Sequence, residues 1–168
     1  MTLIKYEITD LAVVVQLGKL QRKTRDLALK LHLIINRIEV AKIKESTISL
    51  DLEKDYCGFY LFSLNRENLD FRIDLFDGFY DVFADEEEIV IQQKIIPIEK
   101  SLVFIENHLK STVQKTYVNN EGGKSNRSQF DFYIGNEMIN SIGNYGSFNF
   151  FSKNKKKEIM RFGPWIND

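Results

Sequence analysis

Two aspartates face each other across the clearest hairpin in the sequence and are the strongest candidates for acid–base chemistry. Asp77-Gly78 is typical of a two-residue type I′ turn, and a turn centred there places Asp74 opposite Asp81. Two carboxylates this close repel each other, which raises the pKa of one of them and can suit it to general acid–base catalysis. Arg72 can offset part of this repulsion. A solvated sheet face with one neutralising arginine is the simpler interpretation of the same residues.

Phenylalanines share a face of this hairpin with its acids. Strand alternation puts Phe76, Phe79 and Phe83 on the same side as Asp74 and Asp81. Aromatic rings supply area for burial on binding, and carboxylates steer a basic partner. We therefore expect a protein-binding surface made of acidic and aromatic residues: Asp70, Asp74, Phe76, Phe79, Asp81, Phe83, Asp85, Glu86, Glu87 and Glu88. The sequence leaves open whether a helix or the C-terminal strands cover this face.

The other chemically active residue types do not assemble into a recognisable site. His32 and His108 lie in stretches of helical periodicity, and Cys57 is the one cysteine. The chain lacks the paired histidines and cysteines of common zinc motifs. Gly123-Lys124-Ser125 looks like the end of a phosphate-binding loop, but that motif requires glycine where Val118 stands. We expect no catalytic residue, no metal and no cofactor; the alternative is a small hydrolase that combines hairpin carboxylates with one of the histidines.

The hairpin needs a sheet to present it, and the surrounding sequence predicts an antiparallel one. Short polar turns separate segments with apolar alternation, which favours a meander over parallel βαβ units. Strands are expected at residues 47–52, 56–64, 69–76, 79–84, 89–96, 115–118, 129–134, 147–151 and 158–162. Residues 153–157 are expected to form a lysine-rich turn, residues 136–144 a loop or helical turn, and residues 1–8 a short strand or an irregular lead-in.

Two helical regions should pack against this sheet. Apolar residues at three- and four-residue spacings predict helix over residues 10–45, as one helix or as two broken near Gly18 or Thr24, with a strand as the alternative for residues 33–40. Pro97 suits the start of a second helix over residues 98–113. The predicted class is α+β: a single antiparallel sheet of about six to eight strands packed against a long N-terminal helical element and a second helix. We expect residues 1–168 to form a single domain.

The net charge of −1 hides a strong separation of charge along the chain. Residues 51–88 carry a net charge of −9, and the remaining residues carry +8. An acidic face repels nucleic acid and attracts a basic protein. The apolar run at residues 11–15 is too short to span a membrane, and no signal-peptide pattern precedes it. We expect a cytoplasmic protein with a basic protein partner and without nucleic-acid or membrane binding; the oligomeric state stays open.

Residues 79–88, with the sequence FYDVFADEEE, are followed after a single proline by the helix expected at residues 98–113. This combination resembles small bacterial immunity proteins that neutralise polymorphic toxins, including toxins delivered by contact. The resemblance implies a cytoplasmic, non-enzymatic inhibitor that binds a toxin domain, often a basic nuclease, and occludes or distorts its active site. A third possibility beside the inhibitor and the hydrolase is a structural or regulatory subunit that self-associates through a sheet edge or the long helix.

Overall fold

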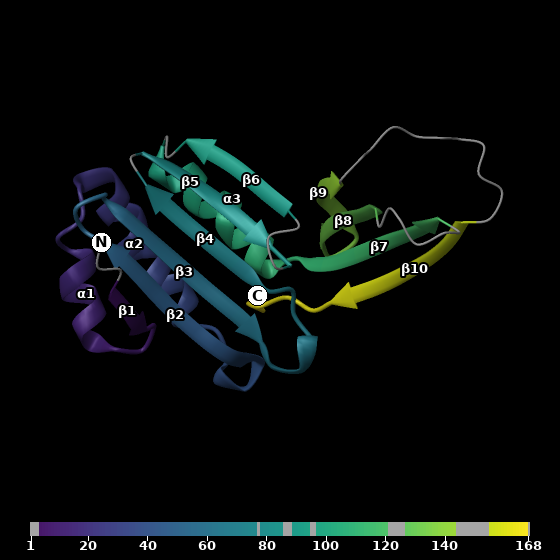
Figure 1. Ribbon diagram of the computed structural model, residues 1–168, viewed down its shortest axis with the longest axis horizontal. Coiled ribbons are helices and arrows are strands. Elements are labelled where there is room, and N and C mark those ends of the chain that lie inside the picture. Colours follow the sequence, from purple (N-terminus) through teal and green to yellow (C-terminus); the bar gives the residue numbers. More distant parts are fainter. Residues whose placement is uncertain are drawn as a thin grey trace.

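A computed structural model of the chain describes residues 4–76, 78–85, 89–94, 97–120, 127–143 and 155–167. Within these residues the chain forms three α-helices, two short 3-10 helices and ten strands in two antiparallel sheets (Figure 1). The predicted α+β class with antiparallel strands is confirmed. The strands divide between two sheets, however, where the sequence led us to expect one.

The large sheet is, in the described part of the chain, a six-stranded meander that follows sequence order. Its strands are β1 (Ile4–Glu7), β2 (Ile43–Asp51), β3 (Tyr56–Ser63), β4 (Phe71–Phe76), β5 (Phe79–Ala84) and β6 (Ile89–Lys94). The predicted meander is confirmed, and so is the hairpin register, because Asp74 pairs with Asp81 and Phe76 with Phe79. Gly78 has a φ of 79°, which glycine adopts without steric cost. Asp77, its partner in the predicted turn, lies outside the described residues.

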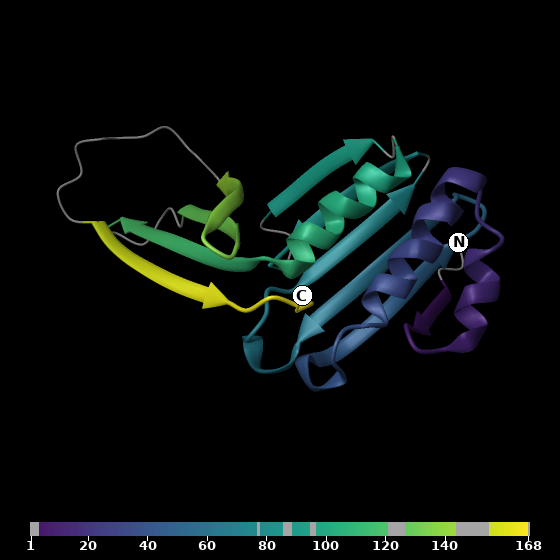
Figure 2. The same ribbon diagram turned by 180° about the vertical axis from the view of Figure 1, so that it is seen from behind.

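Two helices cover one face of the large sheet. They are α2 (Arg22–Ile35) and α3 (Ile98–Lys110), and the shorter α1 (Leu11–Leu17) precedes α2 in the chain. α2 and α3 lie side by side behind the strands in Figure 1 and in front of them in Figure 2. The core fills the space between these helices and the sheet, with Leu27, Leu31 and Ile35 of α2 packed against alternate residues of the strands. No helix in the described ranges has the length and apolar character needed to cross a lipid bilayer.

The helix boundaries show which local predictions were correct. The N-terminal helical region is two helices interrupted at Gly18, one of the two predicted alternatives, and the Asp10 carboxylate caps α1 by accepting the Ala12 N–H at 2.8 Å. The predicted helix over residues 10–45 extends too far, because α2 ends at Ile35 and β2 begins at Ile43. The second predicted helix, over residues 98–113, is also too long, since α3 ends at residue 110 and a strand begins at residue 112.

The N-terminus of α2 is capped by a residue from the turn between β2 and β3. One oxygen of the Asp55 carboxylate accepts the Gln21 N–H at 2.7 Å, and the other accepts the Thr24 hydroxyl. A carboxylate here satisfies an otherwise unpaired amide and complements the positive end of the helix dipole. Because the contact spans 34 residues of sequence, it also fixes α2 against the large sheet.

The small sheet extends from one end of the large sheet (Figure 1). In the described residues its strand order is β10 (Lys155–Phe162), β7 (Thr112–Asn120), β8 (Arg127–Ile134) and β9 (Glu137–Gly143). The loop or helical turn expected at residues 136–144 is wrong for residues 137–143, which form β9. The lysine-rich turn is wrong for residues 155–157, which pair with β7. The strand expected at residues 147–151 lies outside the described residues.

The C-terminal segment, residues 163–166, joins the two sheets. Trp165 is 1% exposed; its indole N–H donates to the Leu69 carbonyl at 2.7 Å, and its backbone N–H donates to the Leu109 carbonyl at 2.8 Å. The Asn68 side-chain amide donates to the carbonyls of residues 163 and 164 at 3.0 and 2.9 Å. The segment thus links the chain just before β4, the end of α3 and the last strand of the small sheet.

Candidate functional site: the open face of the large sheet

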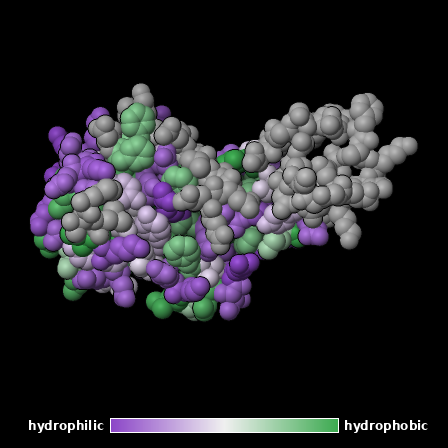
Figure 3. All heavy atoms as spheres, in the orientation of Figure 1, coloured by the Kyte–Doolittle hydropathy of each residue, from purple (hydrophilic) through white to green (hydrophobic). Residues whose placement is uncertain are grey.

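The face of the large sheet that points away from α2 and α3, which we call the open face, carries the predicted hairpin surface. No helix of the described part of the chain lies over it (Figures 1 and 2). In the space-filling view of this side, hydrophilic and hydrophobic residues lie next to each other over the large sheet (Figure 3). The hairpin residues Asp74, Phe76, Phe79, Asp81 and Phe83 therefore lie on the side of the sheet that no described helix covers, the point that the sequence left open.

Aromatic side chains from three adjacent strands gather on the open face. Those described on β3, β4 and β5 are all half-buried: Tyr56, Tyr60, Phe62, Phe76, Phe79 and Phe83. The rings of Phe76 and Phe79 stack with centroids 6.4 Å apart. Sequence reasoning missed the aromatics of β3, because that strand also carries the buried Phe59 on its other side and alternation alone does not say which side is outward. The hairpin register, extended by one strand, would have identified them.

Arg72 lies at the centre of this aromatic group. Its guanidinium carbon is 4.3 Å from the centroid of the Phe83 ring and 5.6 Å from that of Tyr60, distances at which cation and ring attract each other. Its Nη2 and Nε donate to one oxygen of Asp74 at 2.6 and 2.9 Å. The other oxygen of Asp74 accepts the Tyr56 hydroxyl at 3.0 Å. Asp74 is only 5% exposed, so its charge is neutralised within the sheet and is not presented to a partner.

Gly58 makes room for this network. A Cβ atom at position 58 would lie 2.8 Å from Oδ1 of Asp74 and 3.0 Å from Cε2 of Tyr60, and it would also meet the Tyr56 hydroxyl. Real Cβ atoms essentially never have a contact as short as 2.8 Å, and few have one as short as 3.0 Å. Because position 58 has no side chain, the side chains of Tyr56, Tyr60 and Asp74 can pack together over the backbone of β3.

Neither the tyrosine of the network nor the adjacent cysteine is prepared for nucleophilic chemistry. Burial, followed by the hydrogen bond with Tyr60 and the charge of Asp74, raises the pKa of the Tyr56 hydroxyl far above its ordinary value. Burial also raises the pKa of the Cys57 thiol, with further contributions from Asp74 and Asp55. Reactive thiols have lowered pKa values and solvent access, and the fully buried Cys57 has neither.

The remaining predicted acids lie in different surroundings. Asp81 is half-buried on the open face opposite Asp74, and Asp70 accepts the Ser63 N–H at 2.7 Å. Asp85 forms an ion pair with the buried Lys115 of β7, at the junction of the two sheets. The structure therefore brings Asp70, Asp74, Phe76, Phe79, Asp81 and Phe83 together and places Asp85 at the junction. Glu86, Glu87 and Glu88 lie outside the described residues.

The histidines lie on the other side of the large sheet from the hairpin carboxylates. His32 on α2 has its Nε2 2.8 Å from the Ile8 carbonyl oxygen, and His108 on α3 has its Nδ1 2.8 Å from that of Phe104. The sheet separates both rings from Asp74 and Asp81, so the arrangement needed by the hydrolase alternative is not assembled. Among the described residues, no three His, Cys, Asp or Glu side chains are grouped so that they could hold a metal ion.

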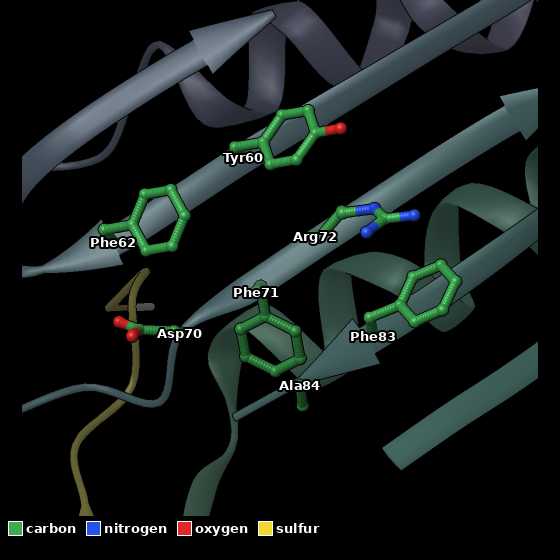
Figure 4. Close-up of a pocket in the computed structure, with 7 residues that line it drawn as sticks. All are labelled: Tyr60, Phe62, Asp70, Phe71, Arg72, Phe83 and Ala84. Atoms are coloured by element: carbon green, nitrogen blue, oxygen red, sulfur yellow. The ribbon is translucent and has the colours of Figure 1, made fainter. Parts of the chain in front are cut away.

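A hollow of about 260 Å³ opens beside Arg72 on the open face (Figure 4). The residues that line it are Tyr60, Phe62, Asp70, Phe71, Arg72, Phe83 and Ala84. A second hollow, of about 200 Å³, lies at the sheet junction and includes Arg66, Asp85 and Lys115. Asp70 borders both hollows, so the open face and the junction meet at this residue.

Comparison with protein-family models, with curated proteins and with solved structures found no match to this chain.

Proposed function

We propose that the chain is a non-enzymatic protein-binding module that receives a basic protein on the open face of its large sheet, and that it acts in the cytoplasm as an immunity-type inhibitor of a toxin domain. One observation carries the proposal. Three adjacent strands present half-buried aromatic side chains among carboxylates on a sheet face over which no described helix lies.

Packing energetics favour a binding role for these rings. Aromatic side chains bury large areas and are enriched among the residues that dominate interface energies. On β3 to β5 they are only partly covered by their neighbours, so a partner that covers them gains the remaining burial. The Tyr56–Asp74–Arg72 network holds the middle of this surface rigid, which reduces the entropy lost on binding.

Electrostatics favour a basic partner. Residues 51–88 carry a net charge of −9, and this segment includes β3, β4 and β5. Since Asp74 is buried and paired, steering falls to more exposed acids, such as Glu45 of β2. Fields of this kind act mainly on the association rate and weaken as salt is raised.

A matched pair of substitutions tests the proposal. We expect Phe79→Ser, on the open face, to weaken binding of a captured basic partner at least about tenfold, as loss of an interface aromatic commonly does. Val103→Ser is the control, because Val103 is a 56% exposed apolar residue of α3, on the opposite side. Equal effects of the two substitutions, or none from Phe79→Ser, would contradict the proposed surface.

The inhibitor role is tested separately, by its effect on growth. A partner that arrests growth when produced alone should be tolerated when produced together with the unsubstituted chain, and should arrest growth again in the presence of Phe79→Ser. Its association rate should fall as salt is raised. A partner that binds through the open face without being inhibited would refute the toxin assignment while retaining the binding surface.

A further inference from the structure

We propose that the hollow beside Arg72 receives a positively charged side chain, lysine or arginine, from the protein partner. The inference rests on the proposed function and names the group that the open face recognises. The hollow is smaller than the roughly 300–1,000 Å³ typical of sites for drug-sized ligands, and its volume of about 260 Å³ suits a single side chain.

The walls of the hollow suit a cation with an apolar stem. Tyr60, Phe62 and Phe83 contribute aromatic rings, whose faces attract positive charge. Arg72 already shows this attraction within the chain, since its guanidinium lies 4.3 Å from the Phe83 centroid. A lysine or arginine of the partner would pack its methylene groups on such rings and keep its charged head at the rim.

The charges around the hollow also favour a cationic side chain. Asp70 lines the hollow, and Glu45 is exposed on β2 directly opposite Phe62 in the strand register. The guanidinium of Arg72 is neutralised by Asp74. An acidic side chain would be repelled by the exposed Glu45, and a purely apolar one would remove water from that carboxylate without replacing the hydrogen bonds of the water. A cationic side chain avoids the repulsion and replaces the lost hydrogen bonds.

Titration of the chain with blocked amino acids, monitored by nuclear magnetic resonance, tests the proposed binding of a cationic side chain directly. The probes are the N-acetyl N-methylamides of arginine, lysine, norleucine and glutamate. We expect saturable shifts of the Tyr60, Phe62 and Phe83 ring resonances with arginine or lysine, and comparison of these two shows whether a guanidinium or an ammonium fits better. Norleucine and glutamate should bind at least about fivefold more weakly. The proposal would be overturned if neither cationic probe gave a saturable shift, or if the norleucine probe bound as tightly as the arginine and lysine probes.

Substitutions at the rim of the hollow provide a second test of the proposal. The double variant Glu45→Gln with Asp70→Asn should weaken binding of the better cation about fivefold or more, and the asparagine keeps an oxygen for the Ser63 N–H. Glu53→Gln is the control, because this exposed acid follows β2 at the end remote from Glu45. Unchanged binding in the double variant would overturn the proposal.

The outcome can be separated from that of the proposed function. Phe79 does not line the hollow. If Phe79→Ser abolishes partner binding but the cation probes do not bind, the open face is the interface and the hollow plays another part in it. If the probes bind and Phe79→Ser leaves partner binding intact, the hollow takes a cation but the proposed interface is wrong.

Discussion

At the scale of single residues, Gly58 is the position on which the polar network of the open face depends most directly. Oδ1 of Asp74, 2.8 Å from a Cβ built at position 58, is held there by the Tyr56 hydroxyl. The other oxygen of Asp74 is held by Arg72. A side chain at position 58 therefore cannot be accommodated without breaking bonds to a buried carboxylate.

We expect Gly58→Ala to lower the free energy of unfolding by about 1–3 kcal/mol, the usual cost of overpacking a tight site. The lower backbone entropy of alanine works in the other direction by roughly 0.5–1 kcal/mol, so the clash should prevail. Urea unfolding measures the change. Gly163→Ala is the control, because the nearest atom to its Cβ would be 3.6 Å away. A loss no larger than that of the control would show that the network shifts without cost.

The sequence predicted which acids share a face with the phenylalanines, but not which of them keep their charge at the surface. Alternation and the two-residue turn determine the faces of β4 and β5, and these features are local. The neutralisation of Asp74 depends on Tyr56, which belongs to the preceding strand, and on the space above Gly58. Such cross-strand contacts arise from tertiary packing, which a one-dimensional pattern does not encode.

At the scale of elements, His108 attaches α3 to the small sheet. Its ring packs against Phe104 of the same helix and Phe132 of β8, with centroids 4.4 and 4.9 Å away. Its Nδ1 faces the Phe104 carbonyl, and the side-chain amide of Asn140 on β9 lies 3.1 Å from its Nε2. This pattern fits a neutral ring that donates from Nδ1 and accepts at Nε2. Burial lowers the pKa of His108, although the hydrogen bond to Phe104 partly opposes the shift.

This lowered pKa predicts a pH dependence of stability. The folded chain binds the proton of His108 less tightly than the unfolded chain, whose histidine has the ordinary pKa of 6.5. The stabilisation is therefore present above pH 6.5 and is lost as the pH falls toward the folded pKa, by up to about 1.4 kcal/mol per pH unit. Urea unfolding near pH 7.5 and pH 5.5 should show a larger loss in the unsubstituted chain than in His108→Gln, which shares every other titrating group. Equal losses would rule out this linkage.

Elements whose sequence signal is local were predicted correctly. Elements whose extent depends on strand pairing were predicted with the wrong bounds or missed. The hairpin has a turn that selects its register, and it was predicted residue by residue. The apolar spacing of α2 continues through Ile38, so the pattern extended the helix although the chain leaves it at Ile35 to pair Ile43 with Ser63. β9 was missed because, as an edge strand with mostly exposed or half-buried side chains, it has little apolar alternation.

At the scale of the whole molecule, the two sheets are joined by backbone contacts as well as side chains. Gly163 donates its N–H to the Glu67 carbonyl at 2.7 Å and forms a parallel bridge with Asn68. Lys115 of β7 adds a buried ion pair with Asp85, at the end of β5, and packs over the rings of Tyr117 and Phe130. The strands divide into two sheets between β6 and β7, which are connected by α3. This division was not predictable from the sequence, because a helical connection can return the chain to the same sheet or lead to another.

The junction formed by Asn68 should determine whether the two sheets unfold together. Asn68→Ala removes two hydrogen bonds to the C-terminal segment and leaves their carbonyl acceptors partly buried, which should cost about 1–3 kcal/mol. Trp165, the single tryptophan, reports on this segment by its fluorescence. Tryptophan fluorescence and far-ultraviolet circular dichroism should give coincident urea transitions in the unsubstituted chain.

In Asn68→Ala the fluorescence transition should move to lower urea than the dichroism transition, because the segment is released before the large sheet unfolds. Asn167→Ala is the control, since the Asn167 side chain makes only an exposed hydrogen bond to Glu39 among the described contacts. Coincident transitions at unchanged stability would mean that the remaining junction contacts hold the segment without the Asn68 side chain. Asn68 is two residues from Asp70, which borders both hollows. Loss of the junction should therefore also weaken binding at the open face, and this connects the assembly of the two sheets to the proposed recognition of a basic partner.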